Sequence, residues 1–148
     1  MAYELKKLNY EISDETARLN IPFIHHYLSV ESYWAQHISF ETVERSIQHS
    51  LCFGLYCNNQ QIGFARLVTD RATFAYLADV FIIKEERGKG LSKWLIRAIM
   101  DHPQLTGLRR WMLATKDAHN LYKQFGWIPL SAPERFMELH KPGAYKMA

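Results

Sequence analysis

Residues 78–93 read ADVFIIKEERGKGLSK, and this stretch decides how the chain is built. Its first six residues, 78–83, are apolar apart from one aspartate and continue an apolar run from Thr73, which is typical of a central strand covered on both faces. Its second half is a glycine-bearing turn that leads into an amphipathic segment. The sequence therefore predicts a strand over residues 73–83, a loop over 84–89 and a helix from about Gly90. The apolar residues of that helix recur at helical spacing, at Leu91, Trp94, Leu95, Ala98 and Ile99.

The junction between this strand and this helix has the properties of an anion site. The first N–H groups of a helix lack intrahelical partners and carry the positive end of its dipole, so they can donate to a phosphate. Gly88 and Gly90 have no Cβ to hold a phosphate away from the backbone, and Arg87, Lys89 and Lys93 add positive charge. The alternative is that the glycines only permit the turn and that the basic side chains are solvated.

Two common phosphate loops do not fit this junction. A Walker loop needs G-x-x-x-x-G-K-[ST], which residues 88–92 do not match. A dinucleotide fingerprint needs a third glycine, and Lys93 occupies that position. An anion bound here would be held by a different kind of loop.

The chain before this stretch predicts helices and then a hairpin. A helix is expected to start at Ser13-Asp14-Glu15 and to break or restart at Pro22. A second helix is expected from about Ser39 to Ser50, with Ser39 as its cap. Residues 51–57 and 62–68 read as two strands joined by the turn Asn58-Asn59-Gln60.

The chain after it predicts alternating strands and helices. Residues 108–115 form an expected strand, and Asp117 can cap a short helix that Gly126 ends. Residues 135–140 are expected to form a last strand. The whole order predicts a mixed, mostly antiparallel α/β (α+β) sheet flanked by helices on both faces, in a single domain over residues 1–148.

Composition restricts the function classes. The chain has no apolar run of the ~20 residues that span a bilayer and no signal-like start, so we expect a cytoplasmic protein without a membrane partner. The net charge is +3 with scattered basic residues, which disfavours nucleic acid as a partner but suits a small anion. Cys52 and Cys57 lie an odd number of residues apart on one expected strand, so we expect two buried thiols without a disulfide or a zinc site.

The segment from Arg87 to Ser92 resembles the acetyl-CoA signature of the GNAT superfamily of N-acetyltransferases, [QR]-x-x-G-x-[GA]. Ser92 departs from the small Gly or Ala of the last position. A second similarity is the Leu121-Tyr122 pair, followed by Gly126-Trp127, where the family often has Leu-Tyr and then glycine and an aromatic residue. The resemblance spans about residues 51–127.

This resemblance implies a GNAT-like fold with acetyl-CoA as co-substrate and no metal. Backbone groups of the strand would pair with the pantetheine arm, and the turn would hold the pyrophosphate. Asp117 is a candidate for lining the thioester, since the asparagine that often does so in the family is not assignable. The expected cofactor-binding residues are Val80, Phe81, Ile82, Arg87, Gly88, Lys89, Gly90, Leu91, Ser92, Lys93 and Asp117.

The resemblance also implies transfer of an acetyl group to a primary amine of a small molecule, peptide or protein. It assigns the general acid for the leaving thiolate to Tyr122, whose ordinary pKa near 10 suits proton donation to a thiolate. Helix periodicity alone would make Tyr122 a core residue. Asp79, the only charged residue in its strand, is a candidate base, an ammonium ligand or a structural ion-pair partner. The amide of Phe81 or Ile82 could polarise the thioester carbonyl.

Several histidines and aromatic residues of the sequence give weaker signals for function. The histidines His25, His26 and His119 have no ligand set for a metal. Tyr27, Tyr33 and Trp34 could line an acceptor pocket, but we favour the core for them. An acyl-CoA sensor or partner-binding module is the alternative function, and a homodimer is possible.

Overall fold

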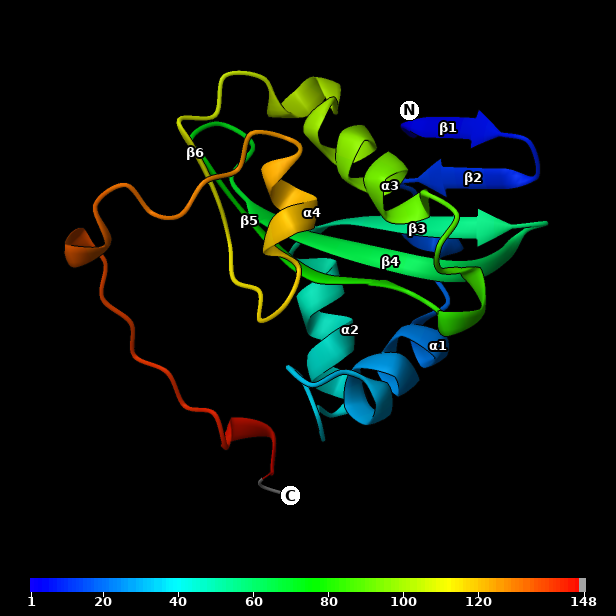
Figure 1. Cartoon of the computed structure of the whole chain (residues 1–148). Helices are drawn as coiled ribbons and strands as arrows, with labels where there is room; N and C mark the ends of the chain where they lie inside the picture. Colours follow the sequence, from blue (N-terminus) through cyan, green and yellow to red (C-terminus); the bar gives the residue numbers. More distant parts are fainter. Residues whose placement is uncertain (147–148) are drawn as a thin grey trace.

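The computed structural model describes residues 1–146 and contains an open six-stranded sheet with helices on both faces (Figure 1). The strands follow the spatial order β1-β2-β3-β4-β5-β6. All neighbours are antiparallel except β5 and β6, which are parallel. This confirms the predicted mixed, mostly antiparallel fold class. The strands are β1 (Glu4–Lys7), β2 (Tyr10–Ser13), β3 (Leu51–Cys57), β4 (Gln60–Thr69), β5 (Phe74–Ile82) and β6 (Arg110–Leu113).

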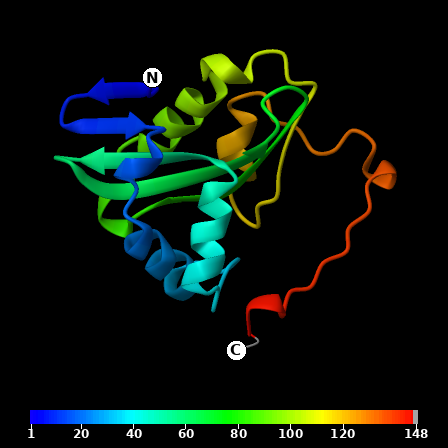
Figure 2. The same cartoon turned by 180° about the vertical axis from the view of Figure 1, so that it is seen from behind.

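Two groups of helices cover the two faces of the sheet, as the views from front and back agree (Figures 1 and 2). The helices α1, η2 and α2 lie on one face, and α3 and α4 lie on the other. Within residues 1–146 no helix is long and apolar enough to cross a membrane. The main helices are α1 (Ile21–His26), the π-helical turn η2 (Tyr27–Glu31), α2 (Phe40–Gln48), α3 (Leu91–Met100) and α4 (His119–Lys123). Short 3-10 turns are η1 (Thr16–Arg18), η3 (Lys84–Glu86), η4 (Pro103–Leu105), η5 (Pro133–Arg135) and η6 (Ala144–Lys146).

Strand alternation divides the core into two layers. On β3, Phe53 and Leu55 belong to the cluster beneath α3, while Cys52 belongs to the cluster beneath α1 and α2. Both thiols are free, and Cys52 is buried as expected. The expectation that Cys57 is buried is wrong, because it ends β3 beside the hairpin turn and is only half-buried. Burial raises the pKa of the Cys52 thiol to about 12, which makes it an inert core group.

The expected signals for the central helices and the hairpin are confirmed. The Ser39 hydroxyl accepts a hydrogen bond from the Thr42 amide at 3.2 Å and caps α2. The α3 stripe is buried at Leu91, Leu95 and Ile99. Asn58 and Asn59 have φ angles of 50° and 67°, the left-handed pair that a two-residue hairpin turn requires.

The expected helix start at Ser13 is wrong, because Ser13 ends β2. Its hydroxyl, which we expected to cap a helix, instead donates to Glu4 of β1 at 2.9 Å. Ser13 therefore joins β2 to β1 in the hairpin. Asp14 accepts from the backbone of Tyr3 and from Nε2 of buried His102, at 2.8 and 2.9 Å. The helix starts instead at Asn20, whose side chain caps α1 with Pro22 in the first turn.

The expected strand over residues 135–140 is also wrong in this structure. Arg135 ends the turn η5, and residues 136–140 have no regular structure. A strand needs a neighbour for its backbone groups, and this segment lies apart from the sheet in both views (Figures 1 and 2). The strand β6 is shorter than the expected 108–115 for a related reason, since its pairing with β5 stops at Leu113.

A glycine in the centre of the sheet gives the first testable prediction. A Cβ at Gly54 would lie 2.3 Å from Oη and 2.6 Å from Cζ of Tyr56, a buried ring that also carries the Arg18 guanidinium at 4.4 Å. We expect Gly54→Ala to lower the free energy of unfolding by about 1–3 kcal/mol, the usual cost of overpacking. Urea unfolding measures this. Gly143→Ala, where a Cβ meets nothing within 4 Å, is the control, and equal stability of the two variants would contradict the packing assignment.

Candidate active site

A β-bulge on β5 shapes the candidate site. Phe81 pairs with Phe64 and Ala78 pairs with Arg66, so two residues of β5 stand opposite one residue of β4. Asp79 lies in this bulge with φ 54°, a left-handed conformation that is uncommon for a non-glycine residue. Such a bulge turns the strand and leaves local backbone groups without ladder partners.

Beyond the bulge, β5 and β6 separate. Their parallel pairing joins residues 74–77 to residues 110–113 and then stops. A cavity of about 540 Å³ lies at this divergence, and its walls come from β5, from the chain after β6 and from the loop before α2. One edge of β5 is therefore open from the bulge onward. Residues on the cavity wall include Tyr33, Trp34, Asp79, Val80, Thr115 and Tyr122.

Tyr122 of α4 is buried and lies on the wall of this cavity. Burial, with a smaller contribution from Tyr33, raises the pKa of the Tyr122 hydroxyl to about 12. The group therefore keeps its proton throughout the neutral and mildly alkaline range. Its ring also packs edge-on against Trp127 at 5.8 Å, so the predicted acid is at once a core tyrosine and a cavity residue.

Asp79 makes an ion pair across the bulge. Its Oδ2 accepts from Nε of Arg66 at 2.8 Å, and its Oδ1 accepts from the indole N–H of Trp34 at 2.8 Å. Of the three roles considered for Asp79, the structural ion pair with a basic side chain is therefore present. Arg66 is a residue of the candidate site that the sequence analysis did not single out, although an aspartate in an apolar strand signals that a cation lies near. Trp34 was considered for an acceptor pocket, but its hydrogen bond to Asp79 was not foreseen.

The expectation that Tyr33 and Trp34 are core residues is wrong. They are 50% and 39% exposed and contribute to the cavity wall, because the loop that carries them crosses the end of β5. The Tyr33 hydroxyl accepts from the Lys116 amide at 3.0 Å and so joins this loop to the chain after β6. Tyr27 is a core residue as expected, stacked on Phe81 at 3.8 Å.

The glycine turn before α3 is arranged as the sequence predicts. Gly88 and Gly90 have φ angles of 80° and 77°, and a Cβ on either would meet nothing within 4 Å. The first hydrogen bond of the helix runs from Trp94 N–H to the Gly90 carbonyl at 3.1 Å. The preceding amides, of Leu91, Ser92 and Lys93, therefore point out of the helix start. A shallow cavity of about 270 Å³ lies over this turn.

The basic side chains of the turn are largely engaged within the chain. Arg87 donates to the Ile82 carbonyl at 3.0 Å and to the Tyr27 hydroxyl at 2.9 Å. Lys89 pairs with Glu86 at 2.8 Å, and hydrogen bonds from Lys89 and Tyr10 lower the pKa of the Glu86 carboxyl. Arg87 and Lys89 thus hold the loop in shape, and Lys93 is exposed at the rim of the cavity.

Asp117 does not cap α4. The cap residue is Ala118, whose N–H donates to the Thr115 hydroxyl at 3.1 Å, while Asp117 is exposed on the rim of the cavity between β5 and β6. The Thr115 hydroxyl thus binds the amide of the cap residue itself, and no side chain caps the first turn of α4. The sequence analysis did not identify Thr115, because Asp117 is also a common cap residue and lies closer to the helix.

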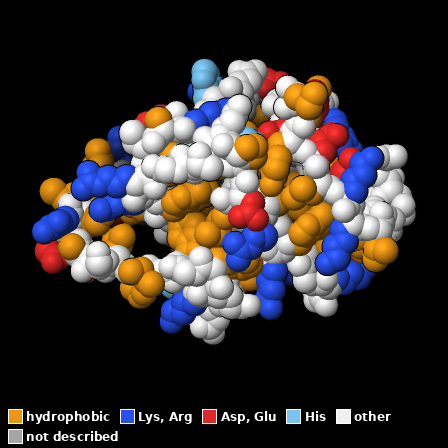
Figure 3. All heavy atoms as spheres, turned by 90° about the horizontal axis from the view of Figure 1, so that it is seen from above, with side chains coloured by type: hydrophobic (Ala, Val, Ile, Leu, Met, Phe, Trp, Pro, Cys, Tyr) orange, Lys and Arg blue, Asp and Glu red, His pale blue; other side chains and the backbone are white. Residues whose placement is uncertain are grey.

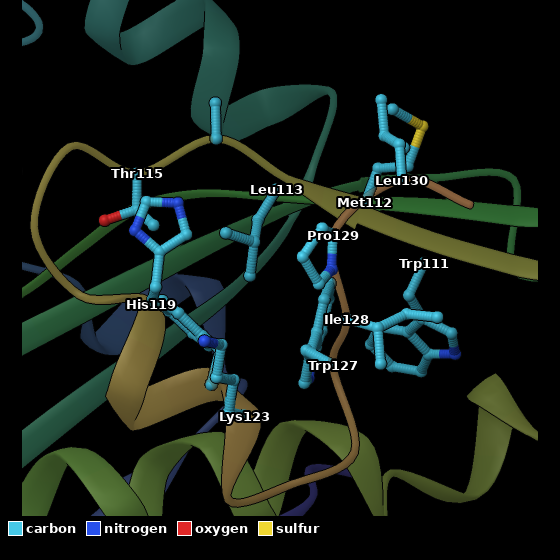
Figure 4. A pocket seen from close by; sticks show the side chains of 12 residues that line it. Trp111, Met112, Leu113, Thr115, His119, Lys123, Trp127, Ile128, Pro129 and Leu130 are labelled. Atoms are coloured by element: carbon cyan, nitrogen blue, oxygen red, sulfur yellow. The ribbon is translucent and has the colours of Figure 1, made fainter. Parts of the chain in front are cut away.

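A second cavity, of about 300 Å³, lies on the other side of β6 (Figure 4). We call it the β6 slot. In Figure 4 the labelled side chains of Trp111 and Leu113 come from β6, and Trp127 and Leu130 come from the chain that follows α4. Tyr122 lies on the walls of both cavities.

The three histidines considered in the sequence hold no metal site. Among residues 1–146 no group of three His, Cys, Asp or Glu side chains is placed to bind an ion. His25 contacts the Ile38 carbonyl at 3.0 Å, His26 lies 3.8 Å from Glu31, and His119 is exposed on the wall of the β6 slot.

Known proteins share these features. The model of the acetyltransferase (GNAT) family matches residues 20–127. A presumed acetyltransferase of Gibberella zeae is 30% identical over 134 residues, which covers 77% of this chain and 76% of that protein. The crystal structure of a presumed GNAT acetyltransferase from Xanthomonas campestris pv. campestris is 46% identical and has a TM-score of 0.92, over 96% of this chain and 100% of that one.

A more distant structure shares the fold. A presumed acetyltransferase from Clostridium acetobutylicum, solved with acetyl-CoA, is 14% identical with a TM-score of 0.63, over 89% of this chain and 95% of that one. The family model matches most of this chain. The matched part, residues 20–127, includes β5, its open edge and the glycine turn before α3. The chain belongs to the GNAT family of acetyltransferases.

Proposed function

We propose that this protein transfers an acetyl group from acetyl-CoA to a primary amine. The observation that carries the proposal is the order of three features along β5. The glycine turn before α3 lies at its end, the open edge of the bulged strand comes next, and the cavity whose wall contains Tyr122 follows. A long thioester with a diphosphate at one end fits this order of groups.

The open edge of β5 supports binding of the pantetheine arm. The Ile83 N–H donates to Ile62 of β4 at 2.9 Å, so the neighbouring Ile82 directs its N–H and carbonyl to the opposite, open edge. The same alternation directs Val80 to that edge and Phe81 toward β4. Arg87 already occupies the Ile82 carbonyl, which leaves the Ile82 amide free to donate. We therefore favour the amides of Val80 and Ile82 over that of Phe81 as donors to the arm and to the thioester carbonyl.

The turn from Gly88 to Lys93 supports binding of the diphosphate. Its amides point outward from the start of a ten-residue helix, and the positive helix end favours an anion. Because Arg87 and Lys89 are bonded within the chain, backbone groups and Lys93 are the groups left to hold the phosphates. Ser92 offers a small hydroxyl beside them, where the GNAT signature has Gly or Ala.

Binding can be tested at Gly90. We expect acetyl-CoA to bind the parent protein in calorimetry and Gly90→Ala to bind at least about tenfold more weakly, or about 1.4 kcal/mol. The added methyl would project into the open space over the turn and strain a φ of 77°.

Gly107→Ala is a matched control for this test. Gly107 has φ 81° and open space at its Cβ, but it lies in the loop before β6, away from the turn. It should lose comparable stability and keep its affinity. Equal affinities for all three proteins would show that the turn does not hold the diphosphate, and absence of heat with the parent would remove the proposal as a whole.

Tyr122 is proposed as the general acid. The amine nitrogen attacks the thioester carbonyl, an N–C bond forms, and the C–S bond breaks. The departing thiolate takes the Tyr122 proton, and the tyrosinate regains a proton from the attacking ammonium or from water. A phenol whose pKa is raised to about 12 stays protonated at neutral pH, so the proton is present when the C–S bond breaks. Because a thiol is more acidic than this phenol, the transfer is uphill, and the return of a proton from the ammonium completes it.

We expect Tyr122→Phe to lower kcat at least about tenfold while leaving the Kd for acetyl-CoA unchanged. Tyr56→Phe is the control, because it removes another buried hydroxyl whose pKa is raised to about 12, far from the cavity. The pH dependence has a definite sign. A raised pKa keeps Tyr122 protonated below about pH 12, so the parent rate should show no loss of this acid between pH 7 and 10. A Tyr122→Phe rate equal to the parent rate would rule out the acid role.

Asp79 is proposed to act on the acceptor side of the cavity. Both of its oxygens accept hydrogen bonds, but each has a further lone pair, and the side chain lies on the cavity wall. Its carboxylate can therefore attract an ammonium while it holds Trp34 in place. The proton of that ammonium would then leave through water or through Asp79.

We expect Asp79→Asn to raise the KM for the amine several-fold, with the KM for acetyl-CoA unchanged. The amide keeps the shape of the carboxylate but loses the charge that attracts an ammonium. Asp101→Asn, at the exposed end of α3, controls for the loss of one negative charge. Steady-state kinetics over a pH series separates the roles, because loss of a base would also remove the acid limb of the kcat profile. An unchanged KM for the amine and an unchanged profile would leave Asp79 with its structural pairing alone.

The alternative function, an acyl-CoA sensor without turnover, shares the binding surface. The two functions differ at Tyr122, because a sensor has no need of a loaded proton donor beside the thioester. Thiol release from acetyl-CoA in the presence of a panel of primary amines distinguishes them.

A further inference from the structure

One lysine side chain lies on the wall of the cavity where an acceptor amine would enter. Lys116 follows Thr115 in the chain between β6 and α4, and both residues line the cavity between β5 and β6. Among residues 1–146 it is the only lysine on that wall. A primary amine, the group that the proposed reaction acetylates, is therefore already present at the cavity of the free protein.

Lys116 is held in this place at two points. Its backbone N–H donates to the Tyr33 hydroxyl at 3.0 Å, and its Nζ lies 5.5 Å from the centre of the Tyr33 ring. A cation over an exposed tyrosine ring is attracted by only about 0.5–1 kcal/mol, so the contact places the ammonium without binding it firmly. Lys89 differs in this respect, because the Glu86 carboxylate holds its Nζ at 2.8 Å.

The ring beneath this ammonium also borders the groups proposed for the chemistry. Tyr33 packs edge-on against Trp34 at 5.0 Å, and the Trp34 indole binds Asp79 at 2.8 Å. Tyr33 also lies close enough to Tyr122 to contribute to the raised pKa of its hydroxyl. The Lys116 amine is thus on the same cavity as the proposed acid and the proposed ammonium ligand.

An amine attached to the protein has an advantage over an amine in solution. Lys116 belongs to the same chain as the open edge of β5, so its amine can meet a bound thioester without the loss of translational freedom that binding imposes on a free amine. Its four-carbon stem is flexible. Nζ can therefore leave the Tyr33 ring and enter the cavity while the backbone of Lys116 stays bonded to the Tyr33 hydroxyl.

We propose that Lys116 is a site of self-acetylation, modified by the acetyl-CoA bound to the same chain, an inference that rests on the proposed transfer to primary amines. The neutral amine attacks the thioester carbonyl, the N–C bond forms and the C–S bond breaks. The departing thiolate takes the Tyr122 proton, and the proton that the nitrogen loses restores the tyrosine through water. The product is an acetylated lysine and free CoA, and one positive charge is removed from the cavity wall.

Mass spectrometry of the labelled chain tests the proposal. The purified chain is freed of earlier acetyl groups with a lysine deacetylase and is then incubated with acetyl-CoA that carries a heavy isotope in its acetyl group. We expect label on Lys116 at least about tenfold faster than on Lys123, because the first amine is held beside the bound thioester. Lys123 is the matched control, since it is also exposed but lines the β6 slot instead.

The concentration dependence separates self-acetylation from reaction in solution. Lysine and arginine side chains lie at many separate places on the face seen in Figure 3, and exposed lysines react slowly with acetyl-CoA without any catalyst. Labelling of Lys116 should saturate at the acetyl-CoA concentration that fills the site in calorimetry, whereas labelling of Lys123 should rise linearly. The rate constant for Lys116 should not change when the protein is diluted, because donor and acceptor are on one chain.

Two variants and a second readout complete the test. Lys116→Arg should lose the fast label, and Lys123→Arg should keep it. Linear labelling of Lys116 at the rate of Lys123, or a rate constant that falls on dilution, overturns the proposal. Thiol release with added amines measures the proposed function separately. Release with added amines while Lys116 stays unlabelled overturns self-acetylation alone, and a parent protein that binds no acetyl-CoA removes both.

Discussion

The left-handed backbone of Asp79 is the constraint on which the site depends. A residue with φ 54° in the middle of a strand breaks the ladder between β4 and β5, and the strand turns at that point. If β5 were regular, its pairing with β6 could continue past Leu77, and no cavity would lie between them. The open edge of β5, where we propose that the pantetheine arm binds, thus depends on one uncommon backbone conformation.

Such a conformation persists only where its surroundings fix it. Here the side chain of the strained residue provides that fixation, through Arg66 on the neighbouring strand and Trp34 on the loop before α2. Arg66 in turn donates to the Ser50 hydroxyl at 3.2 Å, at the end of α2. A half-buried ion pair adds little stability by itself, but breaking one partner leaves a buried charge unpaired. The same three groups therefore hold the bulge and build one wall of the cavity.

The sequence predicted the parts of the fold that local signals specify. The cap at Ser39, the turn at Asn58-Asn59, the buried stripe of α3 and the glycine turn all depend on neighbouring residues, and all are confirmed. Ser13 was misread because its hydroxyl has a cross-strand partner, Glu4, that no local pattern reveals.

The candidate site was predictable to the same extent. The sequence located Tyr122, Asp79 and the glycine turn, each of which lies on a cavity wall. It could not place Trp34 or Arg66 beside Asp79, because these contacts join segments 45 and 13 residues apart. It also could not foresee the partners of the two basic side chains of the turn. Arg87 binds Ile82 and Tyr27, and Lys89 binds Glu86. The sequence of the turn is the same whether these side chains are free or paired. The strand expected over residues 135–140 failed for a different reason, since strand propensity specifies a conformation but not the partner that completes it.

The β6 slot matters for the proposed chemistry, because a single wall separates it from the cavity between β5 and β6. Leu113, Thr115 and Tyr122 line both. The pKa of Tyr122 is raised mainly by burial, so the proton that it holds depends on how completely this wall is covered. Closer packing against either side of this wall would therefore act on the proton of Tyr122 as well as on the fold. The placement of α4 thus links the proposed chemistry to the packing of the chain that follows β6.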